Sequence, residues 1–158
     1  MSRVAAIALG SNLASPWGDR EANLREAVAR VAKLGKVCEV SSFHDTAPVD
    51  TTEQPNFLNG AMLLETELEP LELMRELLGI ERAMGRDRAS TPAKGPRTID
   101  LDLLLMDDVV LETDELTLPH PAMSERRFVL EPLAEIAPTM ADPVSGRTVA
   151  EMLANAPS

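Results

Sequence analysis

Short apolar runs separated by turn residues predict the first elements of the chain. Residues 4–9 are small or β-branched apolar residues that end at the turn-forming residues 10–12, which is typical of a buried strand. Ser15-Pro16 or Asp19 can start a helix, and apolar side chains then recur at helical spacing over residues 24–34. Gly35 follows where a C-terminal cap belongs, so we expect a helix that ends there.

The middle of the chain repeats the strand and helix patterns. Residues 37–43 predict a second strand, and residues 44–55, rich in Pro, Thr and Asp, predict a loop. Strand character returns over residues 57–64, although a Gly-Ala pair weakens it. A second helix is expected from Pro70 to the cap at Gly85, because its apolar residues fall on one face.

The last third of the chain predicts one long strand and several short elements. Residues 99–105 form an apolar run that we expect to be a strand. The Asp107-Asp108 pair predicts a hairpin from that strand into residues 109–111. A further short strand is expected at residues 116–118. Two short helices are expected over residues 131–136 and 148–154.

This order of elements predicts an α+β fold. Strand, helix, strand, strand, helix, strand is the ferredoxin-like split βαβ pattern, which implies a mostly antiparallel sheet with helices packed on one face and an additional C-terminal extension. The 158 residues, 44% of them hydrophobic, fit a single domain over residues 1–158. A fold of this kind does not by itself define a function.

Charge and cysteine content restrict the partners and the compartment. A net charge of −11 argues against binding to nucleic acid or to an anionic membrane, because phosphate groups would be repelled. The apolar run at residues 4–9 is too short for a signal peptide or a membrane span. Cys38 is the only cysteine, so we expect no intrachain disulfide, a buried thiol and a cytoplasmic location.

Asp100 and Asp102 are the first candidates for chemistry. Residues two apart in a strand share one face, so the two carboxylates point the same way, while Leu101 and Leu103 face the core. Like charges at this spacing favour a cation between them, and Mg²⁺ binds one or two carboxylates together with phosphate oxygens. A solvated strand face remains the alternative.

A basic segment precedes the aspartate pair. Arg86, Arg88, Lys94 and Arg97 fall within twelve residues of an otherwise acidic chain. Arginine side chains match phosphate geometry, and arginines beside a carboxylate-bound metal are the components of phosphoryl-type transfer. The segment could also be a solvated positive loop.

Four further side chains have both a structural and a functional interpretation. His120 lies between two prolines that fix its direction, and it is either a structural histidine or a ligand contact. Phe57 and Phe128 are either core residues or plates that stack on a flat ligand. Asn59 shares a strand face with Phe57 and could bond a heterocycle. The chain lacks a Walker A loop, a protein-kinase motif and a typical zinc-site composition.

Five segments resemble one enzyme family in order and spacing. Residues 95–105, Gly-Pro-Arg-Thr-Ile-Asp-Leu-Asp-Leu-Leu-Leu, are similar to the signature of 6-hydroxymethyl-7,8-dihydropterin pyrophosphokinases. The other matching segments are residues 8–13, 54–59, 85–88 and 118–128. Lys94 stands where many members carry an aromatic residue, and Ala89 where some carry a base, so closure of this loop could differ.

The resemblance implies a role for each matching position. It implies that Asp100 and Asp102 hold two Mg²⁺ ions, and that the catalytic residues are Arg86, Arg97, Asp100, Asp102 and His120. The implied pterin contacts are Thr46, Ala47, Val49, Phe57, Asn59 and Phe128. The implied nucleotide contacts are Glu81, Arg88, Leu103, Thr117, His120 and Arg126.

The implied reaction transfers diphosphate from ATP to 6-hydroxymethyl-7,8-dihydropterin, with release of AMP, in folate biosynthesis. The resemblance also implies a monomer whose partners are these two small molecules. One alternative is a kinase that transfers the γ-phosphate of ATP to a small alcohol. The other is a non-enzymatic module that senses a nucleotide.

Overall fold

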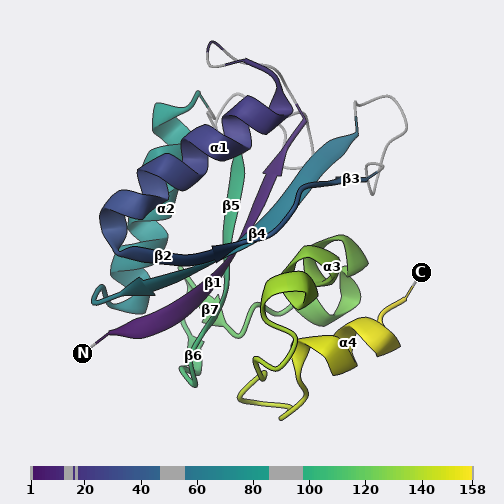
Figure 1. The fold of residues 1–158 in the computed structure, drawn as a ribbon. Helices are drawn as coiled ribbons and strands as arrows, with labels where there is room; N and C mark the ends of the chain where they lie inside the picture. The colour runs from purple at the N-terminus through teal and green to yellow at the C-terminus, as the bar shows by residue number, and fades with distance from the viewer. Residues whose placement is uncertain (1, 13–15, 17, 47–55, 86–97, 158) are drawn as a thin grey trace.

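One antiparallel sheet organises the molecule (Figure 1). The computed structural model describes residues 2–12, 16, 18–46, 56–85 and 98–157. The strands of the sheet are β1 (Arg3–Ser11), β2 (Lys36–Val40), β3 (His44–Thr46), β4 (Phe57–Thr66) and β5 (Asp100–Met106). They lie in the order β2-β4-β1-β5, and β3 also pairs with β4. This is the predicted ferredoxin-like arrangement, so the predicted fold class is confirmed.

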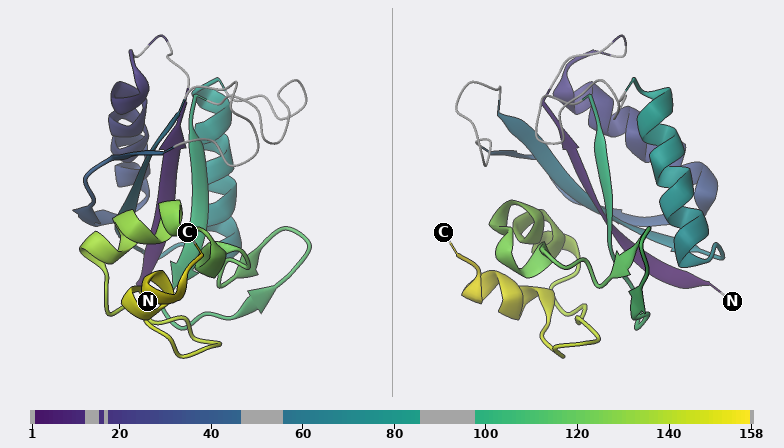
Figure 2. Two further views of the ribbon diagram at one scale, coloured as in Figure 1. Left: turned by 90° about the vertical axis from the view of Figure 1, so that its right-hand side faces the viewer. Right: turned by 180° about the vertical axis from the view of Figure 1, so that it is seen from behind.

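Within the described ranges, four α-helices cover the sheet, and they do so on both of its faces (Figure 2). The helices are α1 (Arg20–Val31), α2 (Pro70–Ala83), α3 (Arg127–Ile136) and α4 (Val149–Asn155). The Asp19 side chain caps α1, and Gly85, with φ of 98°, follows α2 in the left-handed conformation expected of a terminating glycine. The expectation of helices on one face was wrong, because the C-terminal extension packs α3 and α4 against the second face.

Each face of the sheet has its own apolar core. Strand residues alternate between the faces, so Ile7 and Leu9 join the core under α1 and α2, whereas Ala6 and Ala8 join the core under α3 and α4. The residues from the helices in the first core include Leu24, Ala27, Val31, Leu73 and Leu77. Those in the second include Val129, Leu130, Leu133, Val149 and Met152. The sheet is therefore buried over much of both surfaces.

One strand prediction and one loop prediction near the sheet edge were wrong in part. Residues 41–43 are not in a strand, and β3 lies within residues 44–55, which were predicted to be a loop. Partners distant in sequence decide this, because His44 and Asp45 pair with Asn59 and Leu58 of β4. The weak Gly-Ala pair does not interrupt β4, since the Phe43 ring occupies the space beside Gly60.

The hairpin predicted after β5 was also wrong. Asp107 turns the chain with φ of 48°, but β6 (Leu111–Glu112) pairs with β7 (Thr117–Leu118) and not with β5. The Asp107 amide donates to the Val4 carbonyl at 3.0 Å, and its carboxylate accepts from the Val4 amide at 3.1 Å. The turn residue thus extends the pairing of β1, and the chain beyond it leaves the sheet.

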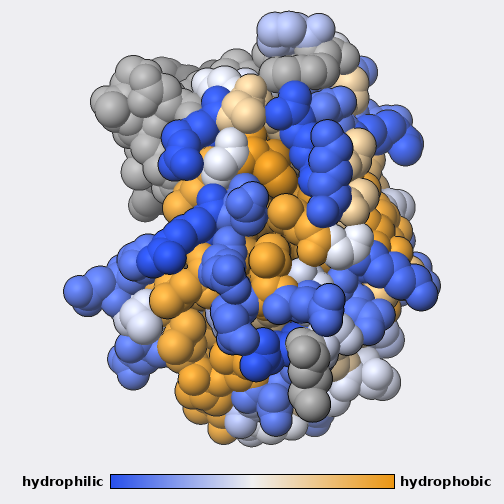
Figure 3. Space-filling model, turned by 90° about the vertical axis from the view of Figure 1, so that its left-hand side faces the viewer, coloured by the Kyte–Doolittle hydropathy of each residue, from blue (hydrophilic) through white to orange (hydrophobic). Residues whose placement is uncertain are grey.

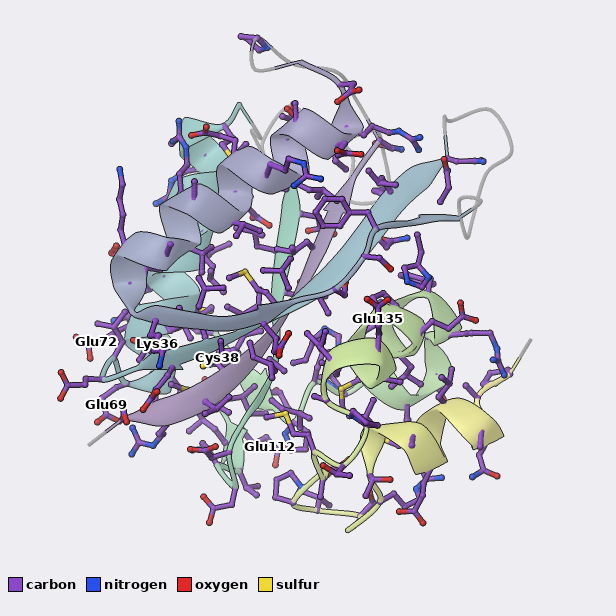
Figure 4. All side chains as sticks on the ribbon, in the orientation of Figure 1. Lys36, Cys38, Glu69, Glu72, Glu112 and Glu135 are labelled. Carbon is purple, nitrogen blue, oxygen red and sulfur yellow. The ribbon has the colours of Figure 1, made fainter. Side chains whose placement is uncertain are left out.

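The expectation of a buried thiol was wrong too. Cys38 is exposed on β2 (labelled in Figure 4), at a shift in register between Val37 and Glu39. Hydrophilic side chains project over much of the surface that Figure 3 shows, with hydrophobic surface between them. Across the described ranges, no helix is long and apolar enough to cross a membrane.

Candidate active site

Three strands bring the candidate residues together at one end of the sheet. Gly10 of β1 pairs with Asn59 of β4 on one side and with Asp100 of β5 on the other. In the next row, Ala8 pairs with Asp102. Since Ala8 belongs to the core under α3 and α4, this alternation places Asn59, Asp100 and Asp102 on the face that carries those helices.

Gly10 supplies the space at the centre of this row. A Cβ atom at Gly10 would lie 3.2 Å from Asn59 Oδ1, 3.7 Å from Phe57 Cδ1 and 3.9 Å from Asp100 Cβ. These distances place an amide, an aromatic ring and the base of a carboxylate around one point. From the sequence, Gly10 ends a predicted strand and lies in the matching segment of residues 8–13, but these neighbours were not predicted, because they come from two other strands.

Asp100 and Asp102 have the orientation that the strand pattern predicted. Leu101 and Leu103, which alternate with them, are each 4% exposed and pack in the core under α1 and α2. The two aspartates are half-buried on the opposite face. A Leu103 contact to nucleotide remains a prediction, and the burial of this side chain does not favour it.

The donor set fits a hard divalent cation that shares its ligands with phosphate. Two carboxylates from one strand are available, and no group of three or more His, Cys, Asp or Glu side chains arranged for a metal occurs among the residues described. Mg²⁺ is usually held by one or two carboxylates, with phosphate oxygens and water completing its octahedron. The pair therefore suits a metal that arrives with a nucleotide.

Glu81 has a structural contact behind the aspartates. Its side chain is on α2 and is 1% exposed, and its Oε2 accepts a hydrogen bond of 2.8 Å from the Leu101 amide. The contact fastens α2 to the strand between Asp100 and Asp102. Its role as a nucleotide contact remains a prediction, which this burial does not favour.

His120 lies beside β5, where its backbone amide donates to the Leu104 carbonyl at 2.9 Å. Burial lowers the pKa of the imidazole, and the positive charge of Arg126 lowers it further, whereas Asp100 acts in the opposite direction. Nδ1 accepts from the Ala122 amide at 3.2 Å, so in the neutral ring the proton is on Nε2. The neutral His120 ring is thus a hydrogen-bond donor through Nε2, and the charges of Asp100 and Arg126 act on its pKa in opposite directions.

Five other predicted residues lie on the elements β3, β4, β7 and α3. Phe128 is half-buried on α3 and packs against the second core, while Phe57 is half-buried at the start of β4. Thr117 is half-buried in β7, and Arg126 is the N-cap residue of α3. The backbone of Thr46 pairs with Phe57.

Several predicted residues lie outside the described residues. They are Arg86, Arg88 and Arg97 of the basic segment, with Lys94 and Ala89, and the pterin contacts Ala47 and Val49. Their roles remain predictions.

The structure adds a polar cluster that sequence analysis did not identify. Ser42, His44 and Glu135 meet between β3 and α3, and the hydrogen bond from His44 to Glu135 spans 91 positions of the sequence. No local pattern signals such a contact, because its partners come from opposite ends of the chain.

Comparison with known proteins gives the family. The family model described as 7,8-dihydro-6-hydroxymethylpterin-pyrophosphokinase matches residues 6–138. A 2-amino-4-hydroxy-6-hydroxymethyldihydropteridine pyrophosphokinase of Bacillus subtilis is 47% identical over 86% of this chain and 79% of its own length. One from Pseudomonas aeruginosa is 41% identical over 96% of this chain and 90% of its own length.

Longer proteins also match. The folic acid synthesis protein fol1 of Schizosaccharomyces pombe is 37% identical over 99% of this chain, which spans only 21% of that protein. A crystal structure of Plasmodium falciparum HPPK-DHPS has the same fold, with a TM-score of 0.75 at 16% identity over 98% of this chain and 44% of that one. The chain therefore belongs to the 7,8-dihydro-6-hydroxymethylpterin-pyrophosphokinase family.

Proposed function

We propose that the chain transfers the terminal diphosphate of ATP to the hydroxymethyl group of 6-hydroxymethyl-7,8-dihydropterin and releases AMP, as a step of folate biosynthesis. The observation that carries this proposal is the row of Asn59, Gly10 and Asp100 across three strands. This row places the Asn59 amide, which can hydrogen-bond a heterocycle, near the Asp100 carboxylate, which can bind a metal ion that also binds phosphate. The names of the bacterial relatives support the same reaction.

The pterin would lie at the Asn59 end of this row. The Asn59 amide has both donors and an acceptor, which suit the polar edge of a pterin, and the side chain is 7% exposed and so is held in place. Phe57 and Phe128 would stack on the two faces of the ring, and Thr46, Ala47 and Val49 would line its edge. Both phenylalanines are half-buried, so each keeps surface for a ligand.

The polyphosphate would lie at the aspartate end. Asp100 and Asp102 would hold two Mg²⁺ ions, which when bound would neutralise phosphate charge and align the reacting groups. His120 would donate from Nε2 to a phosphate oxygen, because its lowered pKa keeps the ring neutral at physiological pH. Arg86, Arg97 and Arg126 would contact the phosphates, and Arg88 and Thr117 would contact the nucleotide.

The reaction would be an in-line displacement at the β-phosphorus. The pterin hydroxyl oxygen would form a bond to that phosphorus as the bond from the phosphorus to the α,β-bridging oxygen breaks. AMP would leave with the bridging oxygen, and the hydroxyl proton would be released to solvent. Transfers of this kind depend mainly on positioning and charge neutralisation. The chain's part is therefore to hold the hydroxyl and the phosphate in line and to exclude water.

Further assignments rest on sequence reasoning. We propose that residues 1–158 act as one domain. The five-stranded sheet, whose strands run from Arg3 to Met106, and the packing of α4 on the core under α3 support this. A monomeric state and a cytoplasmic location remain predictions.

Product analysis tests the proposed function. The protein, ATP, Mg²⁺ and 6-hydroxymethyl-7,8-dihydropterin should yield AMP and the pterin diphosphate in equal amounts. ADP in place of AMP would indicate a γ-phosphate kinase. Nucleotide binding with no turnover across several divalent metals would favour the sensing module.

A binding variant tests the pterin end separately. Phe128→Ala should weaken pterin affinity more than ATP affinity, by about tenfold, because a stacked aromatic ring contributes roughly 1 kcal/mol or more. Isothermal titration calorimetry with each ligand measures both. A larger loss for ATP would remove the stacking role of Phe128.

A further inference from the structure

Three donors from the β3 side converge on one carboxylate of α3. The Ser42 hydroxyl donates to Glu135 Oε1 at 2.6 Å, and the Ser42 amide donates to Glu135 Oε2 at 2.7 Å. His44 Nε2 lies 3.2 Å from the same Oε1. We call Ser42, His44 and Glu135 the β3–α3 latch. Glu135, labelled in Figure 4, lies on the side of α3 that faces the strands.

The latch joins α3, which carries Phe128, to β3, the strand that pairs with Phe57 and Asn59 of β4. His44 pairs directly with Asn59 of β4, two residues along from the pairing of Thr46 with Phe57, so the two pairs share one face. On α3, Phe128 and Glu135 are seven residues apart, and positions i and i+7 lie on one side of a helix. Movement of α3 away from β3 would therefore carry Phe128 away from Phe57 and Asn59.

The charges around the latch support a defined geometry. The hydroxyl and amide of Ser42, followed by the His44 ring, hold the pKa of Glu135 below its ordinary value. The other ring nitrogen of His44 lies 4.0 Å from Glu131, and Glu131 lies 3.7 Å from Arg127. Exposed ion pairs contribute little alone, but the two contacts from Ser42 to Glu135 are short hydrogen bonds from neutral donors.

The opposite face of β3 is fastened by a different ion pair. Arg20 of α1 donates to both oxygens of Asp45, at 3.1 and 2.8 Å, and to the Asn56 carbonyl at 2.7 Å. A strand of three residues, His44–Thr46, makes few backbone bonds, so side-chain contacts on its two faces set its position. The Asp45 pair ties β3 to α1, whereas the latch, together with the contact of His44 with Glu131, ties it to the helix that carries Phe128.

We propose that His44 and Glu135 are positioning residues that set the gap between β4 and Phe128, and with it the affinity for the pterin alcohol. The inference rests on the proposed function. Neither residue touches the reacting atoms, so the latch acts on binding of the flat ring and not on the transfer step. A larger gap would weaken pterin binding and leave ATP binding unchanged.

Steady-state kinetics of AMP formation test the latch. Glu135→Ala removes all three hydrogen bonds and should raise the KM for pterin about tenfold; His44→Ala removes one and should raise it about threefold. The kcat and the KM for ATP should stay within about twofold of wild type, because the latch is remote from the phosphates. His44→Gln supplies an amide donor and should restore most of the affinity.

Two controls separate positioning from general stability. Glu151→Ala on α4 removes another hydrogen-bonded carboxylate, in the capping box with Thr148, and should lower the unfolding midpoint without changing the KM for pterin. In the double variant, His44→Ala should add little to Glu135→Ala, since both remove the same contact. Glu135→Gln, which keeps an acceptor, serves if Glu135→Ala does not fold.

The outcomes are distinguishable. A wild-type protein that forms AMP, with an unchanged pterin KM in both latch variants, would overturn the latch and leave the proposed function intact. Equal losses in kcat and in both KM values, in step with the unfolding midpoint, would show a merely structural role and also overturn it. A wild-type protein that forms no AMP would overturn the proposed function and the latch together.

Discussion

The two faces of the sheet differ in the size of the side chains they present. Towards α1 and α2, the central strands carry Ile7, Leu9, Met62 and Leu64, all 2% exposed or less. Towards α3, the positions alternating with them on β1 are Ala6, Ala8 and Gly10, and β4 contributes Ala61. On β1, Ile7 and Leu9 thus face α1 and α2, and only small residues face α3, although Leu63, Leu104 and Leu105 of the neighbouring strands also join the core on the second face.

The polar residues collect on the second face, beside Gly10. Asn59, Asp100 and Asp102 share the face of the small side chains, at the end of the sheet marked by Gly10. The first face thus stabilises the fold, and the second combines packing near α4 with a site near Gly10.

The largest effect is expected from removal of a carboxylate on the second face, which carries α3 and α4. Asp102→Ala should lower turnover by a hundredfold or more, because a group that stabilises charge in the transition state is typically worth roughly that factor. Pterin affinity, measured by calorimetry, should change little. Asp108→Ala removes an exposed carboxylate from the turn after the same strand and should retain full activity. Undiminished turnover in Asp102→Ala would contradict the metal assignment.

Truncation of a buried side chain on the first face, under α1 and α2, should lower stability instead. Leu64 is fully buried between the sheet and α1 and α2, so Leu64→Ala should reduce the free energy of unfolding by about 2–5 kcal/mol. Urea titration measures this. The kcat of the folded fraction should match wild type, and a strong fall in kcat at full folding would break the proposed division between the faces.

Filling the space at Gly10 should change binding more than folding. Gly10→Ala places a Cβ 3.2 Å from Asn59 Oδ1, so the amide must shift, and we expect roughly a tenfold rise in the KM for pterin. The matched control is Gly79→Ala in α2, where an added Cβ meets nothing within 4 Å. That variant should keep the KM and gain about 0.5–1 kcal/mol of stability. Equal kinetics in the two variants would contradict the role of Gly10.

The smallest expected effect is a pH dependence at the latch. The pKa of Glu135 is lower in the folded chain than its ordinary value of 4.5, so the carboxylate stabilises the fold fully above pH 4.5. This contribution is lost as pH falls through the lowered folded pKa. The stability difference between wild type and Glu135→Gln, no more than about 1 kcal/mol for an exposed group, should therefore vanish in acid. Chemical denaturation at several pH values measures it, and a difference that grows in acid would have the wrong sign.

Local patterns were enough for most elements and for the aspartate pair. Helices α1 and α2 follow from apolar residues at helical spacing, and Asp19 and Gly85 mark their ends. Strand alternation alone placed Asp100 and Asp102 opposite Leu101 and Leu103. These predictions succeeded because each depends on residues within one element.

Contacts between distant segments decided the rest. Pairing with β4 made residues 44–46 a strand, the C-terminal helices covered the second face, and Val4 held Asp107 so that no hairpin formed on β5. The row of Asn59, Gly10 and Asp100 and the latch of His44 and Glu135 likewise join residues far apart in the chain. The sequence determined which face of each element is apolar, because that periodicity is local. Only the tertiary structure determined which faces meet, because burial and hydrogen bonding are satisfied between elements and not within them.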